Sequence, residues 1–267
     1  MGRSHSLTAK RELTWGKLAE KYEIFLLDLW GVLIDGTQCF PYALDFLRFL
    51  RKMNKQVIFL SNTPTLRSML EMELDHIGID ASLYDGIMTS GEAARNYLER
   101  TRNPLLNSYF HIGEEKHAHL LAGLHFAQAN SLENADFILL TAFDPFFASI
   151  LQLDYLKSLN KEMICVNPDR FIITLEGEKK YCAGELAKLF EERGGKVTFV
   201  GKPFPLIFSE ILKQVGQALD KSQMIMIGDN LMTDIRGAKN FGIDSALVNN
   251  SEITTDLPNY VFPSFTI

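Results

Sequence analysis

The sequence has little cysteine, no long apolar run and no excess of basic residues. Its three cysteines, Cys39, Cys165 and Cys182, are far apart and form no CxxC pair. An odd number of widely spaced cysteines argues against both a disulfide framework and a zinc site. The longest apolar runs fall far below the ~18 residues that a membrane-spanning helix needs, so none is expected.

The charge balance and the first residues exclude further classes. A formal charge of -6 and a pI near 5.6 leave no basic surface that would suit a nucleic acid polymer or an anionic membrane. The first ten residues are not followed by an apolar core with a small-residue cleavage site, so we expect no secretory signal and a cytoplasmic location. With 267 residues, 46% of them hydrophobic, the chain is long and apolar enough to bury a core.

Short apolar runs alternate with helix-like stretches along most of the chain. The runs, bounded by Gly and Asn at several helix ends, are typical of strands in a doubly wound parallel sheet of the α/β class. Strands are predicted at 24–28, 56–61, 86–89, 110–113, 137–141, 163–167, 197–200, 224–228 and 246–248. Helices are predicted at 42–53, 66–76, 91–100, 146–160, 183–193, 206–215 and 231–241.

Polar residues end four of these apolar runs. They are Asp28, Ser61 with Asn62, Lys202 after Gly201, and Asp229 after Gly228. Because ligands of open parallel sheets bind beyond the carboxyl ends of the strands, these side chains are predicted to converge on one crevice.

The residue types suit phosphoryl transfer. A buried Asp28 needs compensation, and it could share Mg²⁺ with Asp229, since this ion takes one or two carboxylates and keeps several waters. Asp234 follows five residues later, close enough to hold a metal-bound water. Lys202 would neutralise phosphoryl oxygens.

Each of these pieces also has an ordinary structural explanation. Asp28 could cap a turn, Ser61 and Asn62 could cap a helix before Pro64, and the Gly228–Asn230 segment could be a simple turn. It is the ordered combination of all of them at strand ends that favours a catalytic site.

The ordered motifs resemble those of the haloacid dehalogenase superfamily, and more narrowly its class IIA, the NagD-like and p-nitrophenyl-phosphatase-like hydrolases. The resemblance covers almost the whole chain. It is carried by Asp28-Leu29-Trp30-Gly31-Val32-Leu33, Leu60-Ser61-Asn62, Gly201-Lys202-Pro203 and Gly228-Asp229-Asn230 through Asp234.

The resemblance implies roles for these residues. Asp28 would be the nucleophile of a phosphatase that forms an aspartyl-phosphate, and Ser61, Asn62 and Lys202 would bind the phosphoryl group. The implied substrate is a small phosphorylated metabolite, a phosphomonoester of the sugar phosphate or nucleotide class.

A magnesium site is implied as well. Asp28, Asp229 and the backbone carbonyl of Trp30 would ligate Mg²⁺, with Asp234 as a second-shell acid or a ligand through water.

The resemblance further implies a three-layer, Rossmann-like core with an inserted α/β cap of the C2 type. The core would comprise 1–101 and 196–267, and the cap 102–195. Asn167 and Asp169 would lie on a cap loop that faces the substrate. Cap-mediated homodimers are compatible with the family.

One position departs from the family pattern. The second aspartate of the first motif, which protonates the leaving oxygen and then activates water, is replaced by Trp30. An indole can do neither, and loss of a general acid/base costs about 10² to 10⁴ in rate. Asp35 is the nearest acidic candidate to replace it, although Asp35-Gly36 is also an ordinary turn dipeptide. The alternatives are a non-hydrolytic or very slow protein that binds phosphorylated ligands, and a phosphotransferase.

Overall fold

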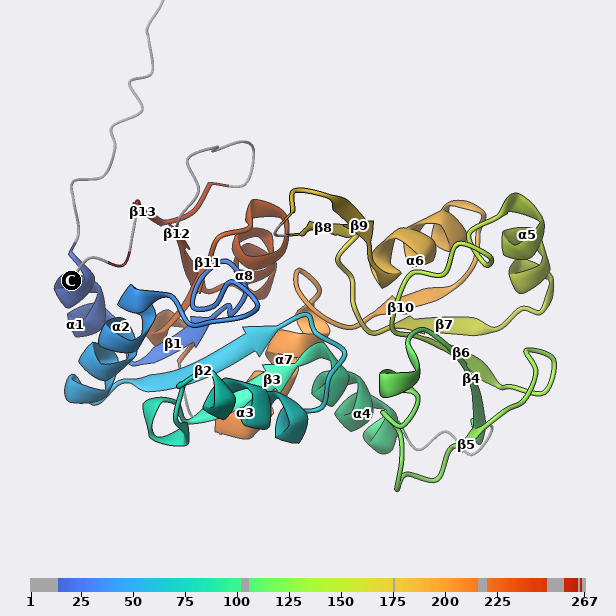
Figure 1. Ribbon diagram of the computed structural model, residues 1–267, viewed down its shortest axis with the longest axis horizontal. Coiled ribbons are helices and arrows are strands. Elements are labelled where there is room, and N and C mark those ends of the chain that lie inside the picture. Colours follow the sequence, from blue (N-terminus) through green and yellow to red (C-terminus); the bar gives the residue numbers. More distant parts are fainter. Residues whose placement is uncertain are drawn as a thin grey trace, which may run out of the picture.

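Two parallel sheets lie side by side along the long axis of the molecule (Figure 1). The first has the strand order β13-β12-β11-β1-β2-β3 and the second the order β10-β7-β6-β4-β5. This computed structural model describes residues 14–101, 106–174, 176–215, 220–248, 257–263 and 265. No helix within those ranges combines the length and the apolar composition needed to cross a membrane.

The first sheet is covered on both faces. All four residues of β1 are buried; Phe25 and Leu27 join one hydrophobic cluster, whereas Ile24 and Leu26 join another. Successive side chains of a strand point to opposite faces, so the two clusters are the two sides of one sheet. The predicted three-layer α/β core is thereby confirmed. Its strands are β1 (Ile24–Leu27), β2 (Gln56–Ser61), β3 (Gly86–Thr89), β11 (Met224–Gly228), β12 (Asp244–Val248) and β13 (Tyr260–Phe262).

Different helices supply the two clusters. The first receives apolar residues of α1 (Trp15–Lys21), α2 (Pro41–Lys52) and α3 (Arg67–His76). The second receives those of α4 (Ser90–Thr101), α7 (Pro205–Val215) and α8 (Arg236–Phe241). Short helical turns complete the set, at η1 (Ala81–Leu83), η2 (Glu115–His117), η3 (Lys221–Gln223) and the π-turn η4 (Leu231–Ile235).

Helix α1 is not among the predicted elements. Thr14 caps it by accepting a hydrogen bond from the Lys17 backbone N–H, and Trp15 stacks on Phe262 and Phe265 from the far end of the chain. Seven residues are too few to form a stable helix alone, so tertiary packing stabilises it.

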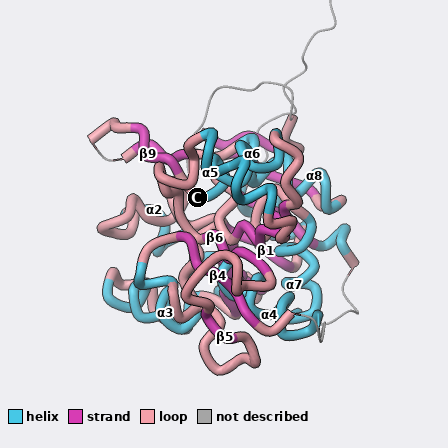
Figure 2. Tube along the Cα trace, turned by 90° about the vertical axis from the view of Figure 1, so that its right-hand side faces the viewer, coloured by secondary structure: helices cyan, strands magenta, loops and turns pink. Residues whose placement is uncertain are grey.

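One face of the second sheet has its own core, and the other face shares the second cluster with the first sheet. The strands of the second sheet are β4 (Ser108–Ile112), β5 (Ala127–Gln128), β6 (Phe137–Leu140), β7 (Glu162–Cys165) and β10 (Val197–Phe199). Helices α5 (Ile150–Ser158) and α6 (Ala183–Glu192) pack apolar residues against it in a third cluster. An antiparallel hairpin, β8 (Phe171–Ile173) with β9 (Lys179–Tyr181), projects from this part of the molecule (Figure 2).

Strand β10 corrects one expectation. Residues 197–200 were expected in the sheet that carries Asp28, but Val197–Phe199 pair with β7 in the second sheet. A short apolar run shows that a strand forms and not which strand it joins. The proposed division into core and cap stays a prediction, and its first boundary, at residue 102, falls outside the described residues.

Candidate active site

Three aspartates meet at the carboxyl end of the first sheet. Asp28 follows β1 and Asp229 follows β11, and these two strands are parallel neighbours. Asp234 lies in η4, immediately after Asp229's loop, and is fully buried. One carboxylate oxygen of each residue lies within 4.8 Å of the others. The sequence therefore predicted the convergence of these acids correctly at the level of geometry.

Two glycines allow this close approach. A Cβ at Gly31 would come within 2.1 Å of Asp229 Oδ2, and one at Gly228 within 2.2 Å of Asp234 Oδ2. Gly31 also has a φ of +78°, which other residues rarely adopt. The carboxylates of Asp229 and Asp234 therefore pack directly against the backbone of Gly31 and Gly228, which fixes their positions.

Lys202 neutralises part of this cluster. Its buried Nζ lies 2.6 Å from Asp28 Oδ1, 2.8 Å from Asp234 Oδ1 and 2.9 Å from the Leu60 carbonyl oxygen. Burial opposes the charge of Lys202, but Asp234 and Asp28 outweigh it and raise the pKa above its ordinary value. The ammonium therefore stays charged beside the Asp28 carboxylate.

Lys202 balances only part of the negative charge of the three aspartates. Burial, followed by the charge of Asp28, raises the pKa of Asp229 to about 7 and that of Asp234 well above its ordinary value. When all three carboxylates are ionised, they and the one ammonium leave an excess of two negative charges. A divalent cation would make the group formally neutral, and clustered carboxylate oxygens are the donors that hard cations prefer. The donor set of these residues thus fits a divalent metal.

Ser61 and Asn62 follow β2 at the same end of the sheet. Ser61 is buried, and its Oγ accepts a hydrogen bond from the Thr63 backbone N–H at 3.3 Å. Asn62 fastens two other loops: its Nδ2 donates to Asp169 Oδ1 and to the Lys202 carbonyl, each at 2.9 Å, and its Oδ1 accepts from the Lys202 backbone N–H at 2.7 Å. We call these three bonds the Asn62 clasp. Both side-chain donors of Asn62 are engaged in it, so a phosphate contact of this residue would use its backbone.

Trp30 and Asp35 lie on the loop after β1. The Trp30 side chain is 45% exposed and packs over Gly36, where a Cβ would approach the ring to 2.6 Å. Asp35 accepts hydrogen bonds from the backbone N–H groups of Thr37 and Gln38 and from both of their side chains. These bonds, led by that of Thr37, lower the pKa of Asp35 to about 2. The geometry therefore favours the turn role of Asp35 over the proton donor that the sequence suggested.

Asn167 and Asp169 come from the second sheet, on the loop after β7. Asn167 Oδ1 accepts a hydrogen bond from the Asp169 backbone N–H at 3.0 Å, which shapes the loop. Asp169 is held by Asn62 from the first sheet, so this loop lies next to the cluster, and its role as a cap loop stays a prediction. Apolar periodicity does not reveal this contact, because it joins residues 107 positions apart.

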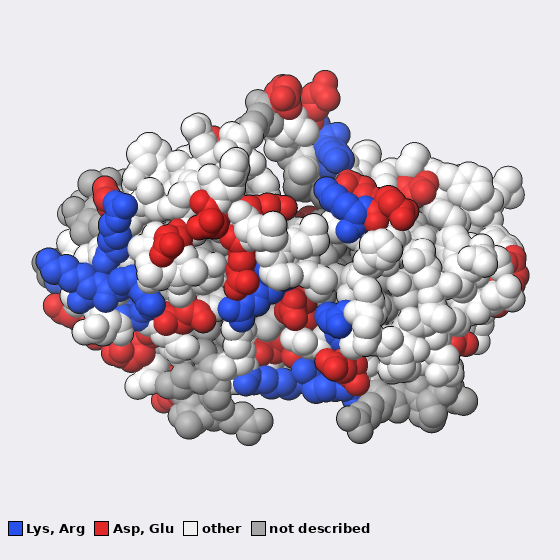
Figure 3. All heavy atoms as spheres, turned by 60° about the horizontal axis from the view of Figure 1, so that its bottom comes forward, with Lys and Arg blue, Asp and Glu red and all other residues white. Residues whose placement is uncertain are grey.

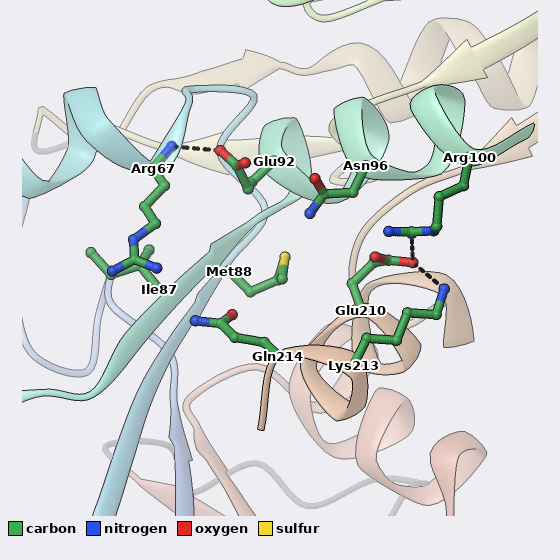
Figure 4. Close-up of a pocket in the computed structure, with 9 residues that line it drawn as sticks. All are labelled: Arg67, Ile87, Met88, Glu92, Asn96, Arg100, Glu210, Lys213 and Gln214. Carbon is green, nitrogen blue, oxygen red and sulfur yellow. Dashed lines mark hydrogen bonds and ion pairs between the residues drawn. The ribbon is translucent and has the colours of Figure 1, made fainter. Parts of the chain in front are cut away.

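A separate pocket of about 250 Å³ lies between β3, α4 and α7 (Figure 4). Its charged residues are largely paired with one another: Glu210 contacts both Arg100 and Lys213, and the Glu92 carboxylate accepts from the Arg67 backbone N–H. The lining does not include the three aspartates. Acidic and basic side chains also intermingle on the face shown in Figure 3. We therefore place the candidate site at the aspartates and not in this pocket.

Comparisons with known proteins identify the family of the chain. A family model described as haloacid dehalogenase-like hydrolase matches residues 25–127, and a second, HAD-hydrolase-like, matches residues 199–266. Between them these ranges include Asp28, Lys202, Asp229 and Asp234.

Relatives match along nearly the full chain. The 5'-nucleotidase YutF of Bacillus subtilis is 26% identical, over 92% of this chain and 96% of its own. An acid sugar phosphatase of Staphylococcus epidermidis is 28% identical, over 87% of this chain and 88% of its own.

Solved structures share the architecture. A 4-nitrophenylphosphatase of Thermotoga maritima superposes with a TM-score of 0.76 at 28% identity, covering 93% of this chain and 96% of that one. A haloacid dehalogenase-like hydrolase of Brucella suis gives a TM-score of 0.82 at 25% identity, covering 94% and 98%. Together with the aspartates on their strand ends, these matches show that the chain belongs to the haloacid dehalogenase-like hydrolases of the NagD and 4-nitrophenylphosphatase type.

Proposed function

We propose that this protein is a Mg²⁺-dependent phosphatase that hydrolyses a small phosphomonoester, a sugar phosphate or a nucleotide, through an aspartyl-phosphate on Asp28. The observation that carries the proposal is the buried Lys202 ammonium bridging Asp28 and Asp234 beside Asp229. The activities for which the relatives are named, acid sugar phosphatase, 5'-nucleotidase and 4-nitrophenylphosphatase, support the substrate class.

Each residue of the site has a separate role in the proposed reaction. Asp28 attacks phosphorus as the bond to the leaving oxygen breaks, and water later cleaves the phosphorus–Asp28 bond to release phosphate. Lys202 and the Ser61 hydroxyl hold phosphoryl oxygens, since positioning and charge neutralisation carry most of this chemistry. Asp28, Asp229 and the Trp30 backbone carbonyl would ligate Mg²⁺, with Asp234 behind them. When bound, the ion would supply positive charge against the phosphoryl oxygens.

The second sheet is proposed as the cap. Its loops after β7 and β10 carry Asp169 and Lys202 to the first sheet, and closure of such a layer excludes water from the reaction. Because β10 pairs with β7, we place the end of the cap after β10 and not at residue 195.

Magnesium should stabilise the fold, and more so as pH rises. In metal-free protein Asp229 keeps a proton up to about pH 7, whereas the unfolded chain loses it near 3.8, so stability falls as pH rises across that window. Mg²⁺ needs the deprotonated acid, so its affinity should rise with pH up to about 7. At a concentration 100 times Kd the gain is about 2.7 kcal/mol, measured as a melting shift against EDTA.

Asp229→Asn should lose most of this shift, whereas Asp154→Asn, at an exposed acid of α5, should keep it. A shift that is equal in both variants, or that is independent of pH, would place the metal elsewhere.

The second candidate, a protein that binds phosphorylated ligands without turnover, is favoured by one observation: Trp30 stands where the family has its acid/base. Phosphate release from p-nitrophenyl phosphate with Mg²⁺ separates the two candidates. We expect the wild type to turn over and Trp30→Asp to change its rate by less than about tenfold, a fraction of what a missing acid/base costs. A silent wild type with an active Trp30→Asp variant would favour the binding protein.

A further inference from the structure

Phosphoryl transfer through Asp28 needs a proton donor that neither residue of the first loop supplies. Trp30 carries no acidic proton, and Asp35 is held ionised by the N–H groups around it. Asp229 and Asp234 belong to the candidate metal and lysine cluster. A further described acid, Asp169, lies close enough to the site for the charges of Asp28 and Lys202 to act on it, and for its own charge to raise the pKa of Asp229.

Asp169 reaches the site on a loop of the second sheet, whereas Asp28 belongs to the first sheet. Strand β2 points toward the second sheet in Figure 1, and its parallel neighbour β1 ends beside it at Asp28, so a phosphoryl group bound there lies between the sheets. In-line displacement puts the leaving oxygen on the side of phosphorus away from the attacking oxygen. Asp28 attacks from the first sheet, so the leaving oxygen faces the second sheet, from which Asp169 projects.

The carboxyl of Asp169 is fixed and still has an oxygen to use. The Asn62 clasp binds its Oδ1, and the same amide holds both backbone groups of Lys202, whose Nζ contacts Asp28 at 2.6 Å. Among the hydrogen bonds of the described residues, none engages Asp169 Oδ2. The clasp therefore fixes one oxygen of the carboxyl and leaves the other for a proton.

We infer that Asp169 is the general acid and base of this reaction, in the role that Trp30 cannot fill; the inference rests on the proposed function. The protonated carboxyl gives its proton to the leaving oxygen as the phosphorus–oxygen bond breaks and the Asp28–phosphorus bond forms. The resulting carboxylate takes a proton from water, whose oxygen attacks phosphorus and displaces Asp28.

The surroundings of Asp169 suit the first of these steps. Burial raises its pKa above the ordinary range, opposed by the hydrogen bond from Asn62 and the charge of Lys202, while the charge of Asp28 raises it further. A carboxyl that retains its proton nearer neutral pH is better able to donate it.

The variant Asp169→Asn isolates proton transfer. Asparagine keeps the Oδ1 acceptor of the clasp and the size of the side chain, but it has no acidic proton. In rapid mixing with p-nitrophenyl phosphate and Mg²⁺, p-nitrophenolate leaves without protonation, so a burst near one equivalent should persist within a few-fold of the wild-type rate. Steady-state turnover should fall by about 10² to 10⁴, with phosphate trapped on Asp28.

Controls separate this inference from a structural role. Asp154→Asn should match the wild type throughout. Trp30→Asp combined with Asp169→Asn should regain turnover, because it restores a carboxyl at the family's usual position. A burst slowed as much as turnover, or a double variant as slow as Asp169→Asn, would show that Asp169 only holds the site together and would overturn the inference.

The phosphate bound covalently to Asp28 also tests the proposed function. If wild-type protein acquires no phosphate on Asp28, both the function and the inference fail. If it does, and Asp169→Asn turns over normally, the inference alone fails.

Discussion

Asp28→Asn is expected to abolish phosphate release, by about 10⁴-fold or more, because removing a covalent nucleophile costs up to about 10⁶ in comparable hydrolases. The fold should survive. Asp28 is one of three crowded carboxylates, and its charge contributes to the raised pKa values of Asp229 and Asp234. Removing that charge relieves repulsion, while Lys202 keeps Asp234 and the Leu60 carbonyl as partners.

The measurement pairs activity with stability. Phosphate release and urea unfolding of Asp28→Asn would be compared with Asp154→Asn, in which an exposed acid receives the same substitution. Activity should vanish in the first variant alone, with neither variant losing more than about 1 kcal/mol of stability, because relief of the repulsion between the three carboxylates offsets the weaker contact of Asp28 with Lys202. An Asp28→Asn protein that keeps a tenth of wild-type turnover would exclude Asp28 as the nucleophile.

Lys202→Met is expected to damage both stability and activity. The ammonium is buried between Asp28 and Asp234, and methionine would leave these carboxylates without a cation. Breaking a buried ion pair by removing one partner costs about 3 to 5 kcal/mol, far more than the 0 to 1 kcal/mol of an exposed pair. Lys188→Met, which breaks the half-exposed pair with Glu191, is the matched control.

A double variant tests the cause. If the unpaired buried acid is what destabilises Lys202→Met, then Asp234→Asn in the same chain should recover part of the loss in urea unfolding, since the two effects are coupled. Saturating Mg²⁺ should recover part as well, by supplying the missing positive charge. Equal stabilities for Lys202→Met and Lys188→Met would show that the bridge contributes nothing to the fold.

The convergence of Asp28 and Asp229 could be predicted from the sequence because it depends only on local patterns. Asp28 and Asp229 each end an apolar run, and parallel strands bring their carboxyl ends to one edge. Nothing more than strand existence and direction was needed. The same local pattern was insufficient for Lys202, since β10 joins the second sheet and its register partners lie some 34 residues earlier, at 163–165.

The contacts between the sheets were not predictable in this way. The Asn62 clasp joins positions 62, 169 and 202, and no periodicity links such distant residues. The sequence offered two interpretations of Asn62, a helix cap before Pro64 and a phosphate contact, and neither of them includes these bonds. The position of the Trp30 ring over Gly36 could not be predicted from the sequence either. The exposure of an aromatic side chain on a loop depends on the segments that pack against it in the folded protein.

The Asn62 clasp limits how this fold can be recombined. The Asn62 amide, at the end of β2, forms hydrogen bonds with the backbone of Lys202 and the carboxylate of Asp169. These two residues lie on the segments that follow β10 and β7. A chimaera that received its second sheet from a relative would inherit both of the relative's segments together. Position 62 would still come from the host chain, so the residue there would not be the one with which those segments normally pair. Grafts that transfer position 62 together with the second sheet should therefore assemble a competent lysine, and grafts cut at the chain boundaries alone should misplace it.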